Sequence, residues 1–305
     1  MNDSPVVSIL MATFNGGAYL REQLDSLIGQ TYTSWRLVVH DDGSTDDTLL
    51  ILGEYQRRDP RISIMDDGVT NLGPAANFLH LMRHVEAQFY MFCDQDDIWL
   101  PEKVNHMVAG IAKYEGPTVL YTNSYLYVGD TAIAQKSTVI HPSTLRDTLF
   151  FNSGIQGCAV IFNRQLMDIL RPFPDTIAMH DHLITMGAVT FGQIVYLDEV
   201  LVWYRQHSKN ATGNQPRGTF RKLISFLAVK KPVISRSHYY ANEAFYAHYR
   251  ELIDVAKKEL FQAYFRYTSS RSVLERLFIV LKHKFALGNK RGLLLVKTMI
   301  RTPID

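Results

Sequence analysis

The sequence predicts an α/β protein with a mostly parallel sheet flanked by helices and a helical extension at its C-terminal end. Three observations support this fold class. Short apolar runs alternate with segments of helical periodicity in the first part of the chain, a rhythm typical of βαβ units. Turn-forming or acidic clusters follow these runs, and strand patterns disappear after Gly218. We therefore divide the chain into an α/β domain at 1–216 and a basic helical region at 217–305.

The composition is that of an ordinary globular protein, with 47% hydrophobic and 20% charged residues among 305. The two cysteines, Cys93 and Cys158, lie in apolar surroundings, which favours a reducing compartment over a disulfide framework. The N-terminus has no basic segment followed by a long apolar core, and no apolar run reaches the roughly 18 residues of a membrane span. We expect a cytoplasmic protein.

Charge is distributed unevenly along the chain. Residues 1–216 hold 14 Lys and Arg against 24 Asp and Glu, a net charge of −10, and residues 217–305 hold 18 against 6, a net charge of +12. A basic tail favours an anionic partner. On charge alone, nucleic acid and an anionic membrane surface are both compatible with it.

The first part of the chain contains four apolar runs typical of strands. They span 6–11, 35–40, 61–65 and 89–92. Leu20, Leu24 and Leu27 recur at helical spacing after the first run. Ser44 and Asp47 have capping-box spacing, which predicts a helix start after the second. Turn residues after the third run lead into another helix.

The pattern changes beyond Pro101, which opens a further helix. A long alternating strand is predicted at 118–128, a flexible turn followed by a strand at 152–162, and a last strand at 194–202. A helix begins near Met179, with an aspartate close to its N-terminus.

One C-terminal segment is strongly amphipathic. Its apolar residues have the i, i+3, i+4, i+7 spacing of one helix face: Leu274, Leu277, Phe278 and Leu281. Basic residues supply a cationic face: Arg276, Lys282, Lys284, Lys290 and Arg291. Such helices suit peripheral attachment to a membrane. Packing against the α/β domain, or against a second subunit in a homodimer, is an equal alternative.

The apolar run at 89–92 leads directly into three carboxylates, Asp94, Asp96 and Asp97. Carboxylates this close repel one another unless a cation neutralises them, and hard oxygen ligands suit Mg²⁺ or Mn²⁺. The alternative is a solvated turn that caps the next helix, although capping requires only one short acidic residue. A cation site at the end of a central strand is therefore the preferred interpretation.

Polar clusters also follow the first two strands: Thr13 with Asn15, and Asp41 with Asp42. The carboxyl ends of parallel strands share one edge of the sheet, so these residues can converge with the acidic run on one ligand. Asp42 could accept a hydrogen bond from the imide of a pyrimidine base while Asp96 holds a metal ion under a diphosphate. Seen alone, the Asp41–Asp42 pair could equally be a turn with helix caps. The common dinucleotide and P-loop glycine motifs are absent.

Together these motifs resemble the nucleotide-sugar glycosyltransferases of family 2, which have the Rossmann-like GT-A fold. The matching segments cover roughly residues 5–210: they are 7–15, 30–32, 39–48, 71–73 and 94–103. The sequence from Cys93 to Trp99 is similar to the motif of the bacterial family members that build surface polysaccharides such as O-antigen, among them many rhamnosyltransferases. The resemblance therefore implies an inverting hexosyl- or deoxyhexosyltransferase that uses a UDP- or dTDP-sugar and a saccharide acceptor.

The resemblance also implies roles for individual residues. Thr13, Asn15, Asp42 and Asn71 line the nucleoside site, with Asp41 beside them. Asp94 and Asp96 form the D-x-D pair that holds Mg²⁺ or Mn²⁺ and the donor diphosphate. His207 reaches back toward the metal, and Arg205 could neutralise the diphosphate instead or in addition. Alone, His207 would more often be a surface loop residue. Asp97 is expected to cap a helix or to contact the acceptor.

Asp181 occupies the place of the general base, which takes the proton from the acceptor hydroxyl. The family usually has Glu-Asp here and this chain has His180-Asp181, which removes one acid beside the base. Gln156 and Gly157, preceded by Gly154, resemble the loop that shapes the acceptor pocket. Trp99 could stack on a sugar, although a tryptophan at a strand end is more often core.

The tail lacks the Gln-x-x-Arg-Trp motif and the membrane spans of processive synthases. We therefore expect the protein to transfer one sugar to a lipid-linked acceptor at the inner face of the membrane. We expect no nucleic-acid partner. Two alternatives stay open. One is an aspartyl phosphatase, disfavoured because its motif usually opens the chain. The other is a degenerate sugar- or membrane-binding protein built on a transferase fold.

Overall fold

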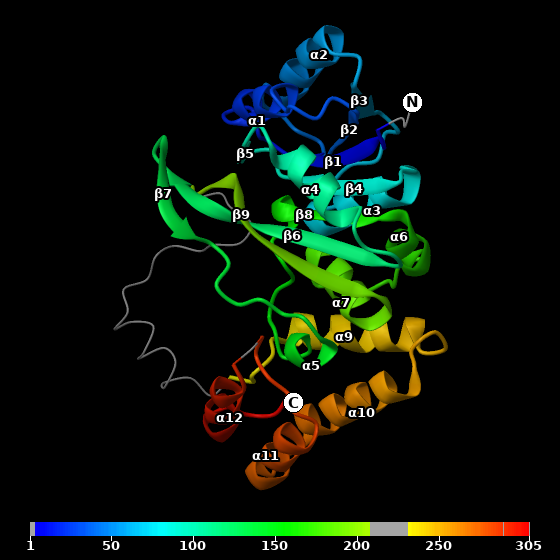
Figure 1. Cartoon of the computed structure of the whole chain (residues 1–305), viewed down its shortest axis with the longest axis vertical. Coiled ribbons are helices and arrows are strands. Elements are labelled where there is room, and N and C mark those ends of the chain that lie inside the picture. The colour runs from blue at the N-terminus through cyan, green and yellow to red at the C-terminus, as the bar shows by residue number, and fades with distance from the viewer. Residues whose placement is uncertain (1–3, 208–230, 289, 305) are drawn as a thin grey trace.

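The computed structural model describes residues 4–207, 231–288 and 290–304. A mixed sheet with strand order β3-β2-β1-β4-β8-β6-β9-β5 runs through the molecule, and β7 pairs with β6. Helices cover both faces of this sheet, and a separate group of C-terminal helices lies below it in Figure 1. The predicted boundary at residue 216 lies outside the described residues.

The first half of the sheet is parallel. Its strands are β1 (Val7–Thr13), β2 (Trp35–Asp41), β3 (Ile62–Met65) and β4 (Phe89–Cys93). The connecting helices are α1 (Leu20–Ile28), α2 (Thr48–Arg58) and α3 (Pro74–His84). β1 lies between β2 and β4 and is parallel to both. The predicted alternation of strands and helices is confirmed, and the polar ends of β1, β2 and β4 meet at one edge.

The second half of the sheet mixes directions. Its main strands are β6 (Thr118–Val128), β8 (Val160–Asn163) and β9 (Gln193–Arg205). The short strands are β5 (Ile98–Trp99) and β7 (Thr131–Lys136). The helices are α4 (Lys103–Ile111), α5 (Leu145–Thr148), α6 (Arg164–Leu170) and α7 (His180–Phe191), with a short 3-10 turn at Gly157–Ala159. β8 is antiparallel to β4 and to β6, while β9 is parallel to β6.

Two apolar layers hold the sheet between its helices. Alternate residues of one strand point to opposite faces, so Ile9 of β1 belongs to the layer with α1, α2 and α4. Leu10 belongs to the layer with α3, α6 and α7. β4 is buried at every position, which explains why its sequence shows no polar alternation.

The C-terminal helices are α9 (Arg236–Tyr249), α10 (Val255–Ser269), α11 (Val273–Lys282) and α12 (Arg291–Ile300). They share a core with the α/β part, since Phe150 stacks edge-on against Tyr264 and Phe285. Tyr249 also donates a 2.6 Å hydrogen bond to the main-chain oxygen of Leu170. In Figure 1, α9 runs below α7.

Two local predictions were wrong. The helix after β2 starts at Thr48, but Ser44 and Asp47 form no capping box: the hydroxyl of Ser44 donates to Asp41, and Asp47 makes no side-chain cap bond. On α11, Arg276 was assigned to the cationic face and is instead buried, 2% exposed, donating to the main chain of Arg301. Ile279 and Val280 supply the buried face of α11.

Three of the four residues of the predicted apolar stripe of α11 face outward, and Leu277 is half-buried. Leu274 is 80% exposed and Phe278 63% exposed, and Leu281 is exposed beside them. Among the described residues, no helix is long and apolar enough to cross a bilayer.

Candidate functional site

A cavity of about 580 Å³ opens at the carboxyl ends of β1, β2 and β4 and at the N-terminus of α7. Several predicted site residues line it: Thr13, Asp42, Asn71, Asp94, Asp96, Gln156, Gly157 and Asp181. The further lining residues are Ala12, Phe14, Gly73, Pro74, Asn77, Phe78, Gln95, Met179, His180 and Tyr204. The topology thus brings residues more than 160 positions apart in the sequence to one space.

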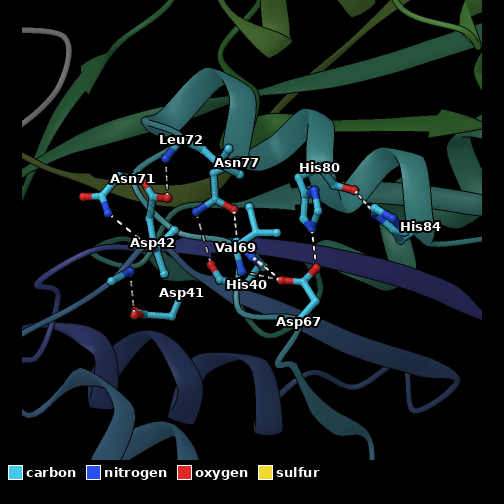
Figure 2. A network of polar contacts seen from close by, with 12 residues as sticks. His40, Asp41, Asp42, Asp67, Val69, Asn71, Leu72, Asn77, His80 and His84 are labelled. Atoms are coloured by element: carbon cyan, nitrogen blue, oxygen red, sulfur yellow. Dashed lines mark hydrogen bonds and ion pairs between the residues drawn. The ribbon is translucent and has the colours of Figure 1, made fainter.

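One end of the cavity is built around Asp42. Its two carboxylate oxygens accept the main-chain N–H groups of Leu72 and Gly73, at 2.7 and 2.8 Å. Asn71, with a left-handed φ of 62°, donates its N–H to the main-chain oxygen of Asp42 (Figure 2). The aspartate therefore positions the loop before α3, and it presents the loop and its own carboxylate to the same cavity.

Asp41 and Asn15 lie behind this wall and are absent from the lining. Asp41 accepts from the Thr13 hydroxyl at 2.8 Å and from the hydroxyl and N–H of Ser44. The side-chain oxygen of Asn15 accepts the N–H of Thr45 at 2.8 Å. Both residues therefore fasten the loops that carry Thr13 and Phe14, and neither side chain faces the cavity.

The acidic run occupies the centre of the cavity. Burial, followed by repulsion from Asp96 and Asp181, raises the pKa of Asp94 to about 7. Asp96 accepts a 2.7 Å hydrogen bond from Nε2 of His207, which stacks on Tyr19. The prediction that His207 returns to the acidic run agrees with this placement.

Asp97 is neither a helix cap nor an acceptor contact, contrary to expectation. It is fully buried, and its Oδ1 accepts the N–H of Arg205 at 3.0 Å. Beside it lie the thiol of Cys158 and Lys103. Burial lowers the pKa of Lys103 to about 7, and its ammonium contacts the main-chain oxygen of Cys158. The buried side chain of Lys103 thus lies next to the acidic run, where its positive form interacts favourably with Asp94 and Asp97.

Trp99 and Arg205 belong to the supporting structure. Trp99 is 2% exposed and outside the cavity lining, and the ammonium of Lys103 lies 3.1 Å from its ring centroid. It is core, the alternative that the sequence left open. The guanidinium of Arg205 donates to Glu22 at 2.6 Å and to the main-chain oxygen of Asp96 at 2.8 Å. It therefore braces the acidic loop from behind, outside the cavity lining.

Asp181 lies opposite, in the first turn of α7. Burial raises the pKa of its carboxyl to about 7, although Oδ1 accepts the N–H of His182 at 2.6 Å. The chain packs tightly here, because a Cβ at Gly154 would lie 2.5 Å from the main chain of Asp181. The close approach explains the glycine that the sequence places in this turn.

His180, the departure from the usual family pattern, is a buried neutral imidazole. Its ring lies 4.0 Å from that of Phe78 and 4.6 Å from that of Phe92, between centroids. Burial lowers its pKa to about 3, and neither ring nitrogen has a hydrogen-bond partner among the described residues. A glutamate would place an unpaired charge among aromatic rings, so an uncharged ring suits this pocket.

Gln156 completes the wall next to Asp181. Its side-chain oxygen accepts from the hydroxyls of Ser124 and Ser137, at 2.7 and 2.8 Å. Sequence reasoning missed Asn77, Phe78 and Tyr204 in the lining. The turn ahead of α3 was a usable signal for the first two, because a helix that starts at the sheet edge directs its first turn into the same space.

The donor set suits a divalent cation. Asp94 and Asp96 supply carboxylate oxygens, and His207 adds an imidazole nitrogen next to Asp96. Carboxylates are the preferred ligands of Mg²⁺ and Mn²⁺, and a cation would favour the ionised form of Asp94, whose pKa is raised by burial and then by repulsion from Asp96 and Asp181.

Comparison with known proteins gives a consistent result. The family model for glycosyl transferase family 2 matches residues 8–169. The chain is 29% identical over 217 residues to the dTDP-rhamnosyl transferase RfbG of Shigella flexneri, covering 67% of this chain and 73% of that protein. It is 28% identical over 166 residues to the UDP-Glc:alpha-D-GlcNAc-diphosphoundecaprenol beta-1,3-glucosyltransferase WfgD of Escherichia coli, covering 54% and 63% respectively.

Solved structures share the fold. S. aureus TarS 1–349 in complex with UDP-GlcNAc superposes with a TM-score of 0.56 at 20% identity, covering 93% of this chain and 89% of that one. The mannosyltransferase PcManGT of Pyrobaculum calidifontis, in complex with GDP-Man and Mn²⁺, gives 0.52 at 16% identity, covering 98% and 85%. The GT-A fold is confirmed, and the family model covers more than half of the sequence. The chain belongs to glycosyl transferase family 2.

Proposed function

We propose that this glycosyltransferase is a metal-dependent, inverting enzyme that moves a hexose or deoxyhexose from a UDP- or dTDP-sugar to a saccharide acceptor. One observation carries the proposal. A single cavity joins the acidic pair Asp94 and Asp96 to a half-buried carboxyl group, Asp181, at the start of α7. A cation-binding edge and a group able to take a proton thus face the same space.

The donor end is the part of the cavity near β1 and β2. Thr13, Asp42 and Asn71 supply the polar wall there, and Asp42 is already held by two main-chain N–H groups. Lone pairs that remain on its oxygens can accept from the imide of a uracil or thymine ring. The names of the relatives RfbG and WfgD, a dTDP-rhamnosyl and a UDP-Glc transferase, favour a pyrimidine donor.

A bound Mg²⁺ or Mn²⁺ would supply charge to hold the diphosphate and stabilise the leaving group. Asp94, Asp96 and His207 are the residues that would hold it. Asp181 accepts the proton of the acceptor hydroxyl as that oxygen attacks the anomeric carbon, and the nucleoside diphosphate leaves from the opposite face. Its pKa near 7 keeps the group basic enough to accept a proton at neutral pH.

The acceptor approaches from the side of Gln156 and Gly157. We propose a lipid-linked saccharide of a bacterial surface polysaccharide, in line with the name of WfgD. The exposed residues Leu274 and Phe278 on α11, next to the exposed Lys282, favour contact with an anionic membrane surface. The basic helical region at 217–305 is accordingly proposed as the attachment part of the enzyme.

The test is donor turnover with a panel of UDP-, dTDP- and GDP-sugars, with Mg²⁺, Mn²⁺ or EDTA. Asp96→Asn removes one carboxylate ligand and should lower metal-dependent turnover by at least about 100-fold, since charge stabilisation by the metal is worth several kcal/mol. Asp198→Asn is the matched control, because Asp198 pairs with Lys136 on the surface.

Full turnover of Asp96→Asn, or of the parent protein in EDTA, contradicts the metal role. Sugar binding without any turnover in the parent protein would instead support the alternative of a degenerate binding protein.

A further inference from the structure

A second cluster of ligand atoms lies outside the cavity, behind its donor end. His40 is the penultimate residue of β2, Asp67 belongs to the loop between β3 and α3, and His80 is on α3. Their side chains converge in Figure 2, and one ligand atom from each lies within 4.8 Å of the others. Two imidazoles and one carboxylate from three elements make a donor set that the proposed reaction does not use.

Asn77 determines which nitrogen of His40 faces this cluster. The side-chain amide of Asn77 donates to the main-chain oxygen of His40 at 3.2 Å, so its oxygen is the atom that contacts Nδ1 of His40 at 2.7 Å. Nδ1 must therefore carry a proton and donate it. In the neutral imidazole, Nε2 then presents a lone pair toward Asp67.

Nε2 of His40 lies 3.4 Å from a carboxylate oxygen of Asp67, and the imidazole is only 1% exposed. A lone pair facing a carboxylate at this distance is repulsive unless a proton or a metal ion lies between them. Ligand atoms bound tetrahedrally to zinc at about 2.0–2.1 Å are separated by about 3.3–3.4 Å. The observed separation matches that spacing.

His80 supplies the third ligand atom of the cluster. Its Nε2 lies 2.5 Å from the other oxygen of Asp67, and the side chain is 13% exposed. This contact is a hydrogen bond, so a bound ion would replace the proton between the two atoms and widen their separation to ligand-to-ligand spacing. Asp67 is more accessible, 33% exposed, so an ion and one water can reach the cluster from solvent.

We propose that His40, Asp67 and His80 form a binding site for a transition-metal ion of the Zn²⁺ class, separate from the acidic pair in the cavity. Imidazole with one carboxylate suits Zn²⁺, whereas Mg²⁺ prefers oxygen ligands only. Asn77 acts as the outer partner that orients the ligating ring, a common feature of histidine metal sites.

The site has a structural consequence for the cavity. The loop that carries Asp67 continues to Asn71 and Gly73, and Asn77 lines the cavity itself. An ion held by His40, Asp67 and His80 would tie the end of β2, this loop and α3 together. The donor end of the cavity would then be rigid before the donor binds.

The test is Zn²⁺ binding to the full chain in an Asp96→Asn background, which weakens the acidic site as a competing ligand set. Equilibrium dialysis should show one equivalent of Zn²⁺ retained at micromolar free metal. His80→Gln should weaken that binding at least about 10-fold, as loss of a protein ligand does. His84→Gln is the matched control, one turn along the same helix with Nδ1 bonded to the main chain of His80.

Co²⁺ provides a readout independent of activity, because tetrahedral nitrogen–oxygen ligation gives visible absorption bands. These bands should appear in the background protein and in His84→Gln, and be absent from His80→Gln and Asp67→Asn. Circular dichroism spectra equal to that of the background protein are the check that both ligand variants fold. Absence of Zn²⁺ binding in the background protein, or equal binding by His80→Gln and His84→Gln, overturns the site.

Discussion

The raised pKa of the Asp181 carboxyl lowers the stability of the folded protein at neutral pH and suits the proposed role of this group as a base. Burial raises the pKa of its carboxyl to about 7, so near neutral pH a large fraction carries a proton. A base must be deprotonated to act, and a buried carboxylate with a pKa near the working pH is a stronger base than an exposed one. The start of α7 thus meets the requirement of the proposed role.

Replacing Asp181 tests this role. Asp181→Asn keeps the shape of the side chain and removes the basic group, so kcat should fall by roughly 10²–10⁴-fold while donor affinity, measured by calorimetry, stays within a factor of about three. In the parent enzyme, kcat should rise with pH through about 7 as Asp181 loses its proton. A loss of donor affinity equal to the loss of kcat would reassign Asp181 to donor binding.

The same pKa predicts a change in stability. The folded carboxyl binds its proton more tightly than the unfolded one, whose pKa is 3.8, so this group's contribution to stability is lost as pH rises from about 4 to 7. Asp181→Asn should therefore raise the melting temperature by roughly 2–4 °C at pH 8, and by less at pH 5. An equal change in melting temperature at both pH values would show that burial does not raise the pKa of the Asp181 carboxyl.

At the residue level, the sequence predicted the polar wall of the cavity but not its support. Thr13, Asp42 and Asp96 follow strands, and the edge they share follows from parallel topology. The buried pairing of Asp97 with Arg205, and the position of Lys103 behind them, depend on side-chain packing between distant segments. No local pattern encodes these contacts, so Arg205 was assigned to the diphosphate when its guanidinium braces a loop.

Among the elements, α7 is positioned by a close main-chain contact with the turn that carries Gly154. A Cβ there would meet the main chain of Asp181 and His182 at about 2.5 Å. That distance is well inside van der Waals contact, so either the turn or the helix end must move.

Gly154→Ala should therefore displace Asp181 and lower kcat at least about 10-fold, because small misplacements of reacting groups are costly. Donor affinity should change little, since the donor end lies on β1 and β2. Gly53→Ala is the control: its Cβ meets only the tip of Arg57, on the middle of α2, and the change should add about 0.5–1 kcal/mol of stability. Equal kcat for Gly154→Ala and the parent would show that the contact does not position α7.

Element types were predictable because the apolar periods are strong, whereas the orientation of elements was not. The stripe of Leu274 and Phe278 marks one side of α11, but periodicity does not say which side a neighbour covers. In the structure Ile279 and Val280 face the core, and the stripe is exposed. The two-residue strand β5 is too short to show any period, and it forms only because β9 passes beside it.

At the level of the whole molecule, the excess of positive charge lies in the region after residue 216, where α11 also exposes apolar side chains. That region has a net charge of +12 against −10 for the rest. The exposed stripe on α11 adds apolar side chains to this basic region. Together these properties favour a membrane surface over a purely aqueous location for the C-terminal helices.

Vesicle sedimentation tests that proposal. The parent protein should bind vesicles with anionic lipids, bind neutral vesicles weakly, and lose binding at high salt. The double change Leu274→Ser with Phe278→Ser should weaken binding at least about 10-fold, because each buried apolar side chain is worth about 1.5–3 kcal/mol. Leu252→Ser is the matched control, at a residue 64% exposed outside α11. Equal binding by all three proteins excludes the stripe as the contact.

The sheet order has an evolutionary consequence. β4 is the last strand of the parallel half, which supplies Thr13, Asp42 and Asp94, and it pairs with β8 of the half of mixed direction, whose segments carry Gln156 and Asp181. Under the proposed roles, the residues that would recognise the activated sugar and those that would recognise its acceptor therefore lie on consecutive segments of the chain, which meet at β4. On this proposal, recombination near β4 would exchange the acceptor specificity and conserve the donor specificity.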